Sequence, residues 1–132
     1  MLDPNNIPPV DDNELLARFV TQSGQFRKRD GTVKSNLFMP HPYRELSVTR
    51  HREATETEIW AEGRSVAASK KLYGRADISC MNCQVDSLTV IAKPLPRNPN
   101  HADIEGWPEE KADKKLIALK LADAASQLIS PV

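Results

Sequence analysis

The ten prolines of this 132-residue chain restrict where helices and strands can form. Three lie within residues 1–12, two at positions 40 and 42, three within residues 94–99, and the last two at positions 108 and 131. Because proline lacks a backbone N–H and disfavours helical conformation in the residue before it, each group ends or interrupts regular structure. The intervals between these groups are therefore the segments that can build a folded core.

The first twelve residues lack apolar periodicity and combine three prolines with Asn and Asp residues. Such a composition buries too little apolar surface to offset the entropy lost on ordering. We therefore predict a disordered tail over residues 1–12. The remaining length supports one hydrophobic core, which predicts a single domain over residues 13–132.

Four short segments have the composition of β-strands. The apolar run at residues 15–20 is interpreted as a first strand, with a helical turn as the alternative. Residues 46–49 and 75–80 alternate apolar and polar side chains, and residues 88–92 are rich in β-branched types. The Asp30-Gly31 pair indicates a turn after the first strand.

Two segments have the features of α-helices. Thr55 and Glu58 have the spacing of a capping box, and a glycine follows two lysines downstream, which predicts a helix over about residues 55–70. Pro108 suits a first helical position, and the apolar residues after it fall on one arc of a helix, which predicts a second helix over about residues 108–128. The expected fold class is α+β, with a small sheet packed against these two main helices.

Composition and the N-terminal sequence indicate the cellular compartment in which the protein is expected. The chain has no apolar run of the roughly 18 residues that a membrane span needs. Its first residues lack the basic and apolar regions of a secretory signal, and its two cysteines are too few to staple a domain of this size. We therefore expect a cytoplasmic protein without membrane contact.

The charge is balanced overall but unevenly distributed. Residues 27–75 carry eleven Lys and Arg against six Asp and Glu, a net charge of +5, although the whole chain sums to zero. This excess could attract phosphate or an acidic partner, while a solvated surface of mixed sign is the simpler interpretation. The basic cluster at residues 27–34 has no interleaved aromatic residues on which bases could stack, so a nucleic-acid partner is not favoured.

Cys80 and Cys83 form a Cys-x-x-Cys motif that could supply half of a zinc site. The other ligands are missing, because His41, His51 and His101 are scattered without ligand spacing. A redox pair would follow a strand within a βαβ unit, which the pattern lacks. We expect structural cysteines, no bound metal and no cofactor.

The stretch from His101 to Pro108 is the first candidate site. It places His101, two carboxylates and Trp107 on an expected loop before a helix N-terminus, where unpaired amides favour anions. His101 could act as a general acid or base, because the pKa of a histidine is ordinarily near neutrality. In the alternative, Trp107 fixes the loop to the core and His101 caps a backbone group.

Arg75 is the second candidate, because it follows an expected helix end and could bind a phosphate or carboxylate through two parallel hydrogen bonds. The alternative is an ion pair between Arg75 and Asp77 that shapes the turn.

Four segments together resemble a family of small uncharacterised bacterial proteins. They are LSV at residues 46–48, EIW at 58–60, YGRAD at 73–77 and HADIEGWP at 101–108. No activity, cofactor or ligand is established for that family. The resemblance therefore implies a bacterial origin and singles out Arg75, His101 and Trp107 as binding residues to test, and it does not include the two cysteines.

Two functional hypotheses follow. The chain lacks the GxxxxGK[ST], GxGxxG, HExxH and GxSxG motifs, which favours a binding or accessory module that works through contact with a protein partner and leaves catalysis open. The alternative is a small enzyme acting on a phosphate-containing substrate, a nucleotide or RNA, with His101 as acid/base and Arg75 as anion ligand, assisted by Lys111 or Lys114. The enzyme hypothesis requires Arg75 and His101 to converge in one pocket.

Overall fold

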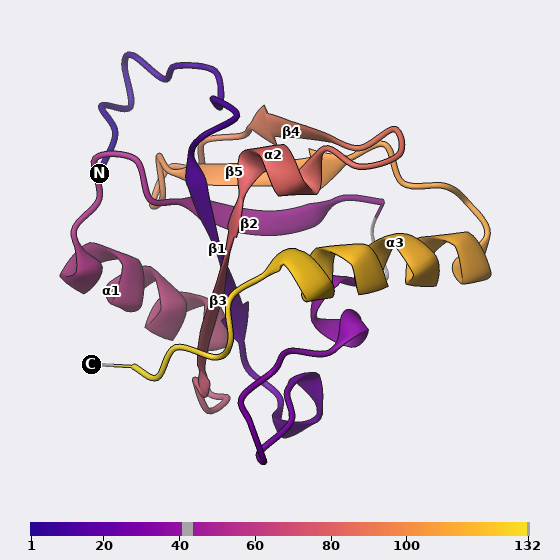
Figure 1. The fold of residues 1–132 in the computed structure, drawn as a ribbon. Helices are drawn as coiled ribbons and strands as arrows, with labels where there is room; N and C mark the ends of the chain where they lie inside the picture. The colour runs from indigo at the N-terminus through magenta and orange to yellow at the C-terminus, as the bar shows by residue number, and fades with distance from the viewer. Residues whose placement is uncertain (41–43, 132) are drawn as a thin grey trace.

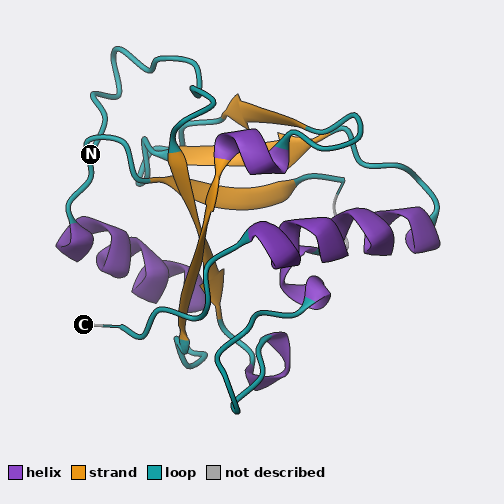
Figure 2. Cartoon of the chain, viewed as in Figure 1, coloured by secondary structure: helices purple, strands orange, loops and turns teal. Residues whose placement is uncertain are grey.

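A computed structural model describes residues 1–40 and 44–131 of the chain. The fold is α+β, as the sequence predicts, with a five-stranded sheet, two longer helices and three short helical turns (Figures 1 and 2). In chain order the elements are β1 (Leu15–Val20), η1 (Ser23–Gln25), η2 (Ser35–Phe38), β2 (Leu46–Arg50), α1 (Glu56–Ala67), β3 (Gly74–Ser79), α2 (Cys80–Cys83), β4 (Thr89–Ala92), β5 (His101–Glu105) and α3 (Lys111–Ala124).

The sheet has the strand order β3-β1-β2-β5-β4, and all neighbouring strands are antiparallel. β1 pairs with β3 along its whole length but with β2 at only two positions. The β3–β1 half and the β2–β5–β4 half therefore run in different directions, and the two halves cross in Figure 1.

Each face of the sheet has its own core. Leu16 and Val20 of β1 join the larger core, which α3 and η2 cover with Leu121, Leu37 and other side chains. Alternate residues of the same strand point the other way, and Phe19 packs with Ile59 of α1 in a smaller core. The period of two along β1 thus divides its side chains between the two cores.

The first helix begins as its sequence predicts. Thr55 accepts a hydrogen bond from the Glu58 amide, and the Glu58 side chain accepts one from the Thr55 amide, which completes the capping box. The helix ends at Ala67, before the expected residue 70, and the downstream Gly74 lies in β3 instead of at the helix end.

The last helix is shorter than predicted. It runs from Lys111 to Ala124 and not from 108 to 128, and Glu110 is its N-cap. Pro108 therefore lies before the helix. Ile117 and Leu121 on the expected apolar arc are buried, whereas Leu128 contacts the core from the segment that follows the helix.

The expected loop at residues 101–105 is a strand, which corrects the prediction. His101–Glu105 forms β5, paired on both sides with β2 and β4. The prolines before it do not hold an extended loop, because Leu95 and Asn98 exchange two backbone hydrogen bonds of 3.0 Å around a tight turn. The prolines occupy the ends and tip of this hairpin, where no ladder N–H is required.

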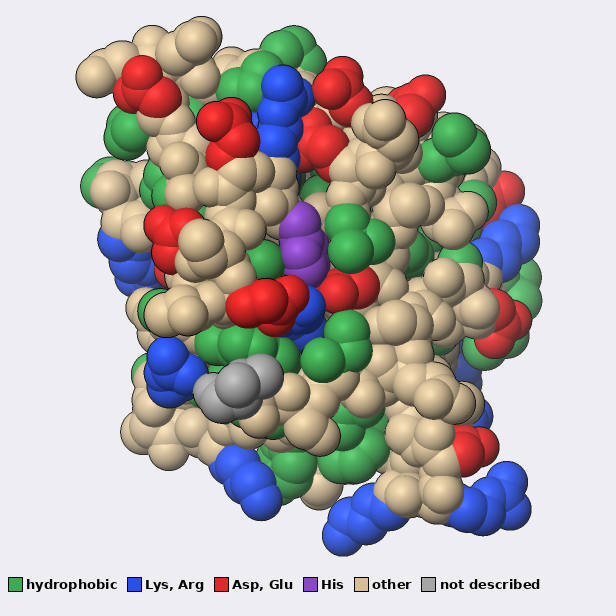
Figure 3. Space-filling model, turned by 60° about the vertical axis from the view of Figure 1, so that its left-hand side comes forward, with side chains coloured by type: hydrophobic (Ala, Val, Ile, Leu, Met, Phe, Trp, Pro, Cys, Tyr) green, Lys and Arg blue, Asp and Glu red, His purple; other side chains and the backbone are tan. Residues whose placement is uncertain are grey.

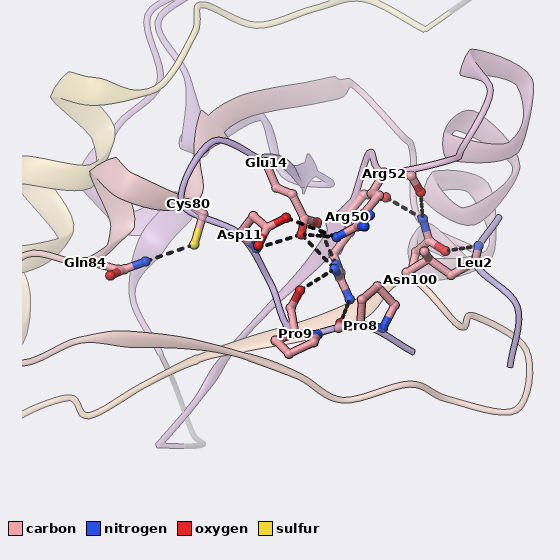
Figure 4. Close-up of polar contacts among 10 residues, drawn as sticks. All are labelled: Leu2, Pro8, Pro9, Asp11, Glu14, Arg50, Arg52, Cys80, Gln84 and Asn100. Atoms are coloured by element: carbon pink, nitrogen blue, oxygen red, sulfur yellow. Dashed lines mark hydrogen bonds and ion pairs between the residues drawn. The ribbon is translucent and has the colours of Figure 1, made fainter. Parts of the chain in front are cut away.

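The N-terminal segment lies against the domain, in contrast to the disordered tail expected for residues 1–12. Leu2 is buried, and its amide donates to Asn100 Oδ1 at 2.8 Å (Figure 4). The carbonyls of Pro8 and Pro9 accept hydrogen bonds of 2.8 and 3.2 Å from the guanidinium of Arg50. Composition did not show this interaction, because the acceptors are backbone atoms.

Arg50 itself is fully buried and paired. Its Nε and Nη2 donate to the two carboxylate oxygens of Glu14 at 2.7 Å each, in the bidentate arrangement that suits a guanidinium. The ion pair and the two proline carbonyls together satisfy a charge that would otherwise be costly to bury. This network ties the N-terminal segment to β2.

Candidate functional site

The candidate site lies where β1 and β2 diverge. The two strands pair at Leu16 with Arg50 and at Ala17 with Thr49, and then separate. Arg18 occupies the fork, with Nε donating to the Leu37 carbonyl at 2.9 Å and Nη1 donating to the Ser47 carbonyl at 3.0 Å. A side chain thus replaces the backbone ladder at this point.

A cavity of about 270 Å³ opens at this fork on the face that α1 covers. We call it the fork pocket. Its walls come from β1, β2, the second half of α1, the β4–β5 turn and the first residue of β5. Its polar lining residues are Arg18, Ser47, Thr49, Glu62, Ser65, Arg97 and His101.

His101 is held in one orientation in the fork pocket. Its Nδ1 lies 2.8 Å from the Lys93 carbonyl oxygen, which can only accept, so Nδ1 carries a proton. Nε2 lies 3.5 Å from Oδ1 of Asp103, and both side chains are 14% exposed. Oδ1 is buried and has no hydrogen-bond partner among the described residues. A proton on Nε2 or on the carboxyl removes the repulsion between two facing lone pairs.

Asp103 is an acid in an unfavourable environment. Burial raises the pKa of its carboxyl, and the negative charges of Glu45 and Glu105 raise it further. The neighbouring His101 and Lys93 offset only part of this increase. The carboxyl therefore keeps its proton to a higher pH than an exposed aspartate does.

Glu62 is a second such acid and lines the fork pocket from α1. It is buried, and burial raises the pKa of its carboxyl despite the nearby Arg97 and His101 and a hydrogen bond with Asn98. Perturbed acids that meet a histidine in a concavity are typical of functional sites.

Arg18 is a cation at the fork, but its side chain leaves β1 on the side of Leu16 and Val20 and donates to Leu37, opposite to the face that α1 covers. Burial lowers the pKa of its guanidinium to about 10, so it remains charged at neutral pH. Its hydrogen bonds go to two carbonyl oxygens, and no ion pair to it forms within residues 1–40 and 44–131. Arg97, at the tip of the hairpin, is the arginine that lines the cavity from the side of α1.

Arg75 lies outside the fork pocket and is paired with two carboxylates. Its Nη1 and Nη2 donate to the carboxylate of Glu56 at 2.8 and 2.9 Å, and its Nε donates to Asp77 at 3.0 Å. The guanidinium also stacks on the ring of Trp60, 4.7 Å from its centroid. Strands β1 and β2 separate β3 from β5, and Arg75 is not among the residues that line the fork pocket. Its local ion pair with Asp77 was the alternative that the sequence left open.

Trp107 lies beyond the other end of β5 from His101. Its Nε1 donates to the Ile104 carbonyl at 2.9 Å, and the ring packs against the larger core. The structure therefore does not bring together the three residues that the sequence singled out. Of these, only His101 lines the fork pocket.

Three residues of the candidate site were missed from the sequence: Glu62, Arg97 and Asp103. The alternation His-Ala-Asp-Ile-Glu at residues 101–105 was a usable signal, because a strand puts His101 and Asp103 on one face. The position of Glu62 gave no signal, since it depends on where α1 crosses the sheet.

The other sequence motifs form no comparable site. Cys80 and Cys83 are buried free thiols in the short helix α2, and burial raises the pKa of Cys83 to about 12. Over residues 1–40 and 44–131 there is no group of three or more His, Cys, Asp or Glu that could hold a metal ion. His41 lies outside the described residues.

The basic segment at residues 27–34 forms a turn, as its Asp-Gly pair predicts. The Arg27 amide donates to the Thr32 carbonyl at 2.8 Å, and Phe26 pairs with Val33. On the face shown in Figure 3, acidic and basic side chains are interspersed among small hydrophobic patches. Across the part of the chain that the structure describes, no helix is long and apolar enough to cross a bilayer.

Comparison of the chain with protein-family models, with curated proteins and with solved structures gave no match. The resemblance to a bacterial family therefore remains a prediction, and functional inference rests on the geometry of the fork pocket.

Proposed function

We propose that the fork pocket binds a small phosphate-containing ligand and that His101 exchanges a proton with it. The observation that carries this proposal is the buried, unpartnered Oδ1 of Asp103 beside Nε2 of His101, because His101 in turn lines the fork pocket together with Glu62 and Arg97. Polar groups buried without partners reduce stability, so their presence favours a role in binding or chemistry.

The guanidinium of Arg97 indicates the ligand class. Arg97 lines the cavity from the hairpin turn and lies near enough to Glu62 to lower the pKa of that carboxyl in part. Guanidinium groups bind phosphate and carboxylate oxygens in two-pronged geometry. The cavity volume of about 270 Å³ lies near the lower limit for ligand sites, which suits a phosphate group with a small substituent.

Ligand binding in the fork pocket is expected to depend on the protonation state of Glu62. An ionised Glu62 repels a phosphate, whereas the protonated acid does not, and burial already raises the pKa of Glu62. The ligand is therefore expected to raise the pKa of Glu62 further and to bind more tightly as pH falls. Asp103 lies beside the imidazole of His101 and can share its proton, which would supply the acid/base function of His101 in the alternative hypothesis of a small enzyme.

The binding test uses calorimetric titration with inorganic phosphate and 5′-mononucleotides at pH 5.5 and pH 7.5. Arg97→Ala should weaken binding by roughly tenfold or more, since a charge-assisted hydrogen bond is lost. Arg64→Ala, an exposed arginine of α1 that does not line the pocket, is the matched control. Binding that is absent, or that both variants reduce equally, would contradict the proposal.

The chemical test uses ³¹P NMR to follow the release of phosphate from phosphomonoesters and nucleotides, and the conversion of the phosphodiesters of a short RNA to terminal or cyclic phosphate esters. If the site is catalytic, His101→Ala should lower turnover by roughly 10²–10⁴-fold while ligand affinity changes little. Binding without turnover would make the protein a ligand-binding module.

We also propose a reducing compartment, the bacterial cytoplasm, as the location. Both cysteines are free thiols, which is the usual state there.

A further inference from the structure

The two edges of the sheet differ in how their outward backbone groups are satisfied. On β3, the outward-facing residues are Arg75 and Asp77. Arg75 exchanges hydrogen bonds of 3.0 and 2.8 Å with Ile129, and Asp77 accepts from the Ser126 amide at 2.8 Å and donates to its hydroxyl at 2.9 Å. The C-terminal segment therefore closes this edge.

The β4 edge is open. The Lys93 amide donates to the His101 carbonyl directly opposite it at 3.0 Å, which fixes the register so that residues 89, 91 and 93 face β5. The N–H and C=O groups of Val90 and Ala92 therefore point outward. Within residues 1–40 and 44–131 they have no hydrogen-bond partner.

The surroundings of this edge are apolar. The N-terminal segment runs beside it without pairing, and its Pro9 has no N–H to offer. Between them lies an open groove of about 430 Å³ whose described lining residues are all uncharged. Ile91 of β4, which also lines this groove, is 40% exposed. The charged side chains that usually protect an edge strand are absent from Thr89–Ala92.

We propose that β4 pairs antiparallel with β4 of a second copy of this chain, about a twofold axis at Ile91. In that register Val90 lies opposite Ala92 of the other copy, so that the four outward N–H groups and the four outward C=O groups can form four hydrogen bonds. The two Ile91 side chains meet at a non-hydrogen-bonded pair, where side chains are closest.

The charge distribution favours a second copy of this chain as the partner of β4. Lys93 lies opposite Thr89 in the twofold register, so no like charges meet, and two copies of a chain with zero net charge do not repel each other at long range. Pro94 lacks an N–H, and the Leu88 amide already donates to Val85 at 3.0 Å, so the ladder stops at four bonds. An interface of this size is expected to associate weakly.

Sedimentation velocity over a concentration series, from about 5 µM to about 1 mM, tests the proposal. The parent should change from monomer to dimer across this range. Val90→Pro removes an outward N–H together with the valine side chain that packs against the larger core, so it should weaken association by roughly tenfold or more relative to Val90→Ala, which loses the same packing. Val90→Ala keeps the N–H and is the matched control.

Ile91→Lys is the second variant, in case Val90→Pro does not fold. It places two lysines against each other at the axis and should abolish dimers while the exposed site tolerates the change. A parent that stays monomeric at about 1 mM overturns the proposal, and the edge would then be free for a strand of another protein. A dimer that survives both variants also overturns it, because the contact must then lie elsewhere.

Discussion

Asp103 is the residue whose position is hardest to explain by a contribution to the stability of the fold. Its carboxyl is mostly buried, one oxygen has no hydrogen-bond partner in the described chain, and Glu45 and Glu105 surround it with like charge. A carboxyl whose pKa is raised in the folded state stabilises the fold while it is protonated, and that contribution is lost as pH rises through the raised pKa. At neutral pH, Asp103 therefore reduces the stability of the fold.

Asp103→Asn should raise the melting temperature at pH 7, by roughly 1–4 °C. The amide carries no charge to bury, and its N–H can donate to Nε2 of His101. Asp123→Asn, at an exposed position of α3, is the control and should have no effect. Differential scanning calorimetry at pH 7 measures both. A less stable Asp103→Asn variant would show that the ionised pair with His101 holds the strand in place.

At the scale of single elements, the first four strands and the start of α1 could be predicted from the sequence, because alternation and a capping box are local signals. β5 could not, since the prolines before it suggested a loop and the pairing partners of His101–Glu105 are distant in sequence. The candidate site could not be predicted from the sequence for the same reason. Glu62 comes near His101 only because α1 crosses the sheet at this point.

Gly74→Ala tests the closure of the β3 edge. Gly74 has a φ of 157°, and a Cβ added there would overlap the carbonyl oxygen of Ile129. The C-terminal segment would have to leave β3, so we expect a loss of roughly 2–4 kcal/mol in urea denaturation. Gly24→Ala is the matched control, because a Cβ there meets nothing within 4 Å. Equal stabilities of the two variants would mean that the segment contributes little.

The N-terminal segment is the element on which composition and structure disagree. Deleting residues 1–9 removes the buried Leu2 and leaves the Arg50 guanidinium without the carbonyls of Pro8 and Pro9. Each unmet hydrogen bond of a buried charged group costs roughly 1–3 kcal/mol, so the thermal midpoint should fall by several degrees. A midpoint equal to that of the full chain would restore the interpretation of this segment as a dispensable tail.

At the scale of the whole molecule, two groups of carboxyls have opposite effects on how the stability of the fold depends on pH. Burial alone would raise the pKa values of Glu14 and Asp77, but hydrogen bonds and charges from Arg50, and from His51 and Arg75, lower them overall. A lowered pKa contributes stability that is present above the unfolded value, about 4, and is lost as pH falls through the folded value. Glu62 and Asp103 act in the opposite direction.

Glu14→Gln tests how much the first group, the carboxyls whose pKa values are lowered in the folded state, contributes to stability. At pH 7 the variant leaves Arg50 buried without its charged partner and should be less stable by roughly 3–5 kcal/mol. As pH falls toward 2 and passes through the lowered pKa of Glu14, the glutamate of the parent becomes protonated as well, so the difference should shrink. Urea denaturation at both pH values checks this, and a deficit of the same size at pH 2 would show that packing, and not the ion pair, is lost.

The most direct test of the fork pocket is an NMR titration of the side-chain carboxyl carbons of Asp103 and Glu62, with and without inorganic phosphate. The account predicts that both carboxyls titrate above the ordinary values for aspartate and glutamate, about 3.9 and 4.3, and that phosphate raises the midpoint of Glu62 further. Arg97→Ala should remove the effect of phosphate and leave the raised midpoints in place. Ordinary or lowered midpoints, unchanged by phosphate, would contradict the claim that this pocket is built for an anion and a proton.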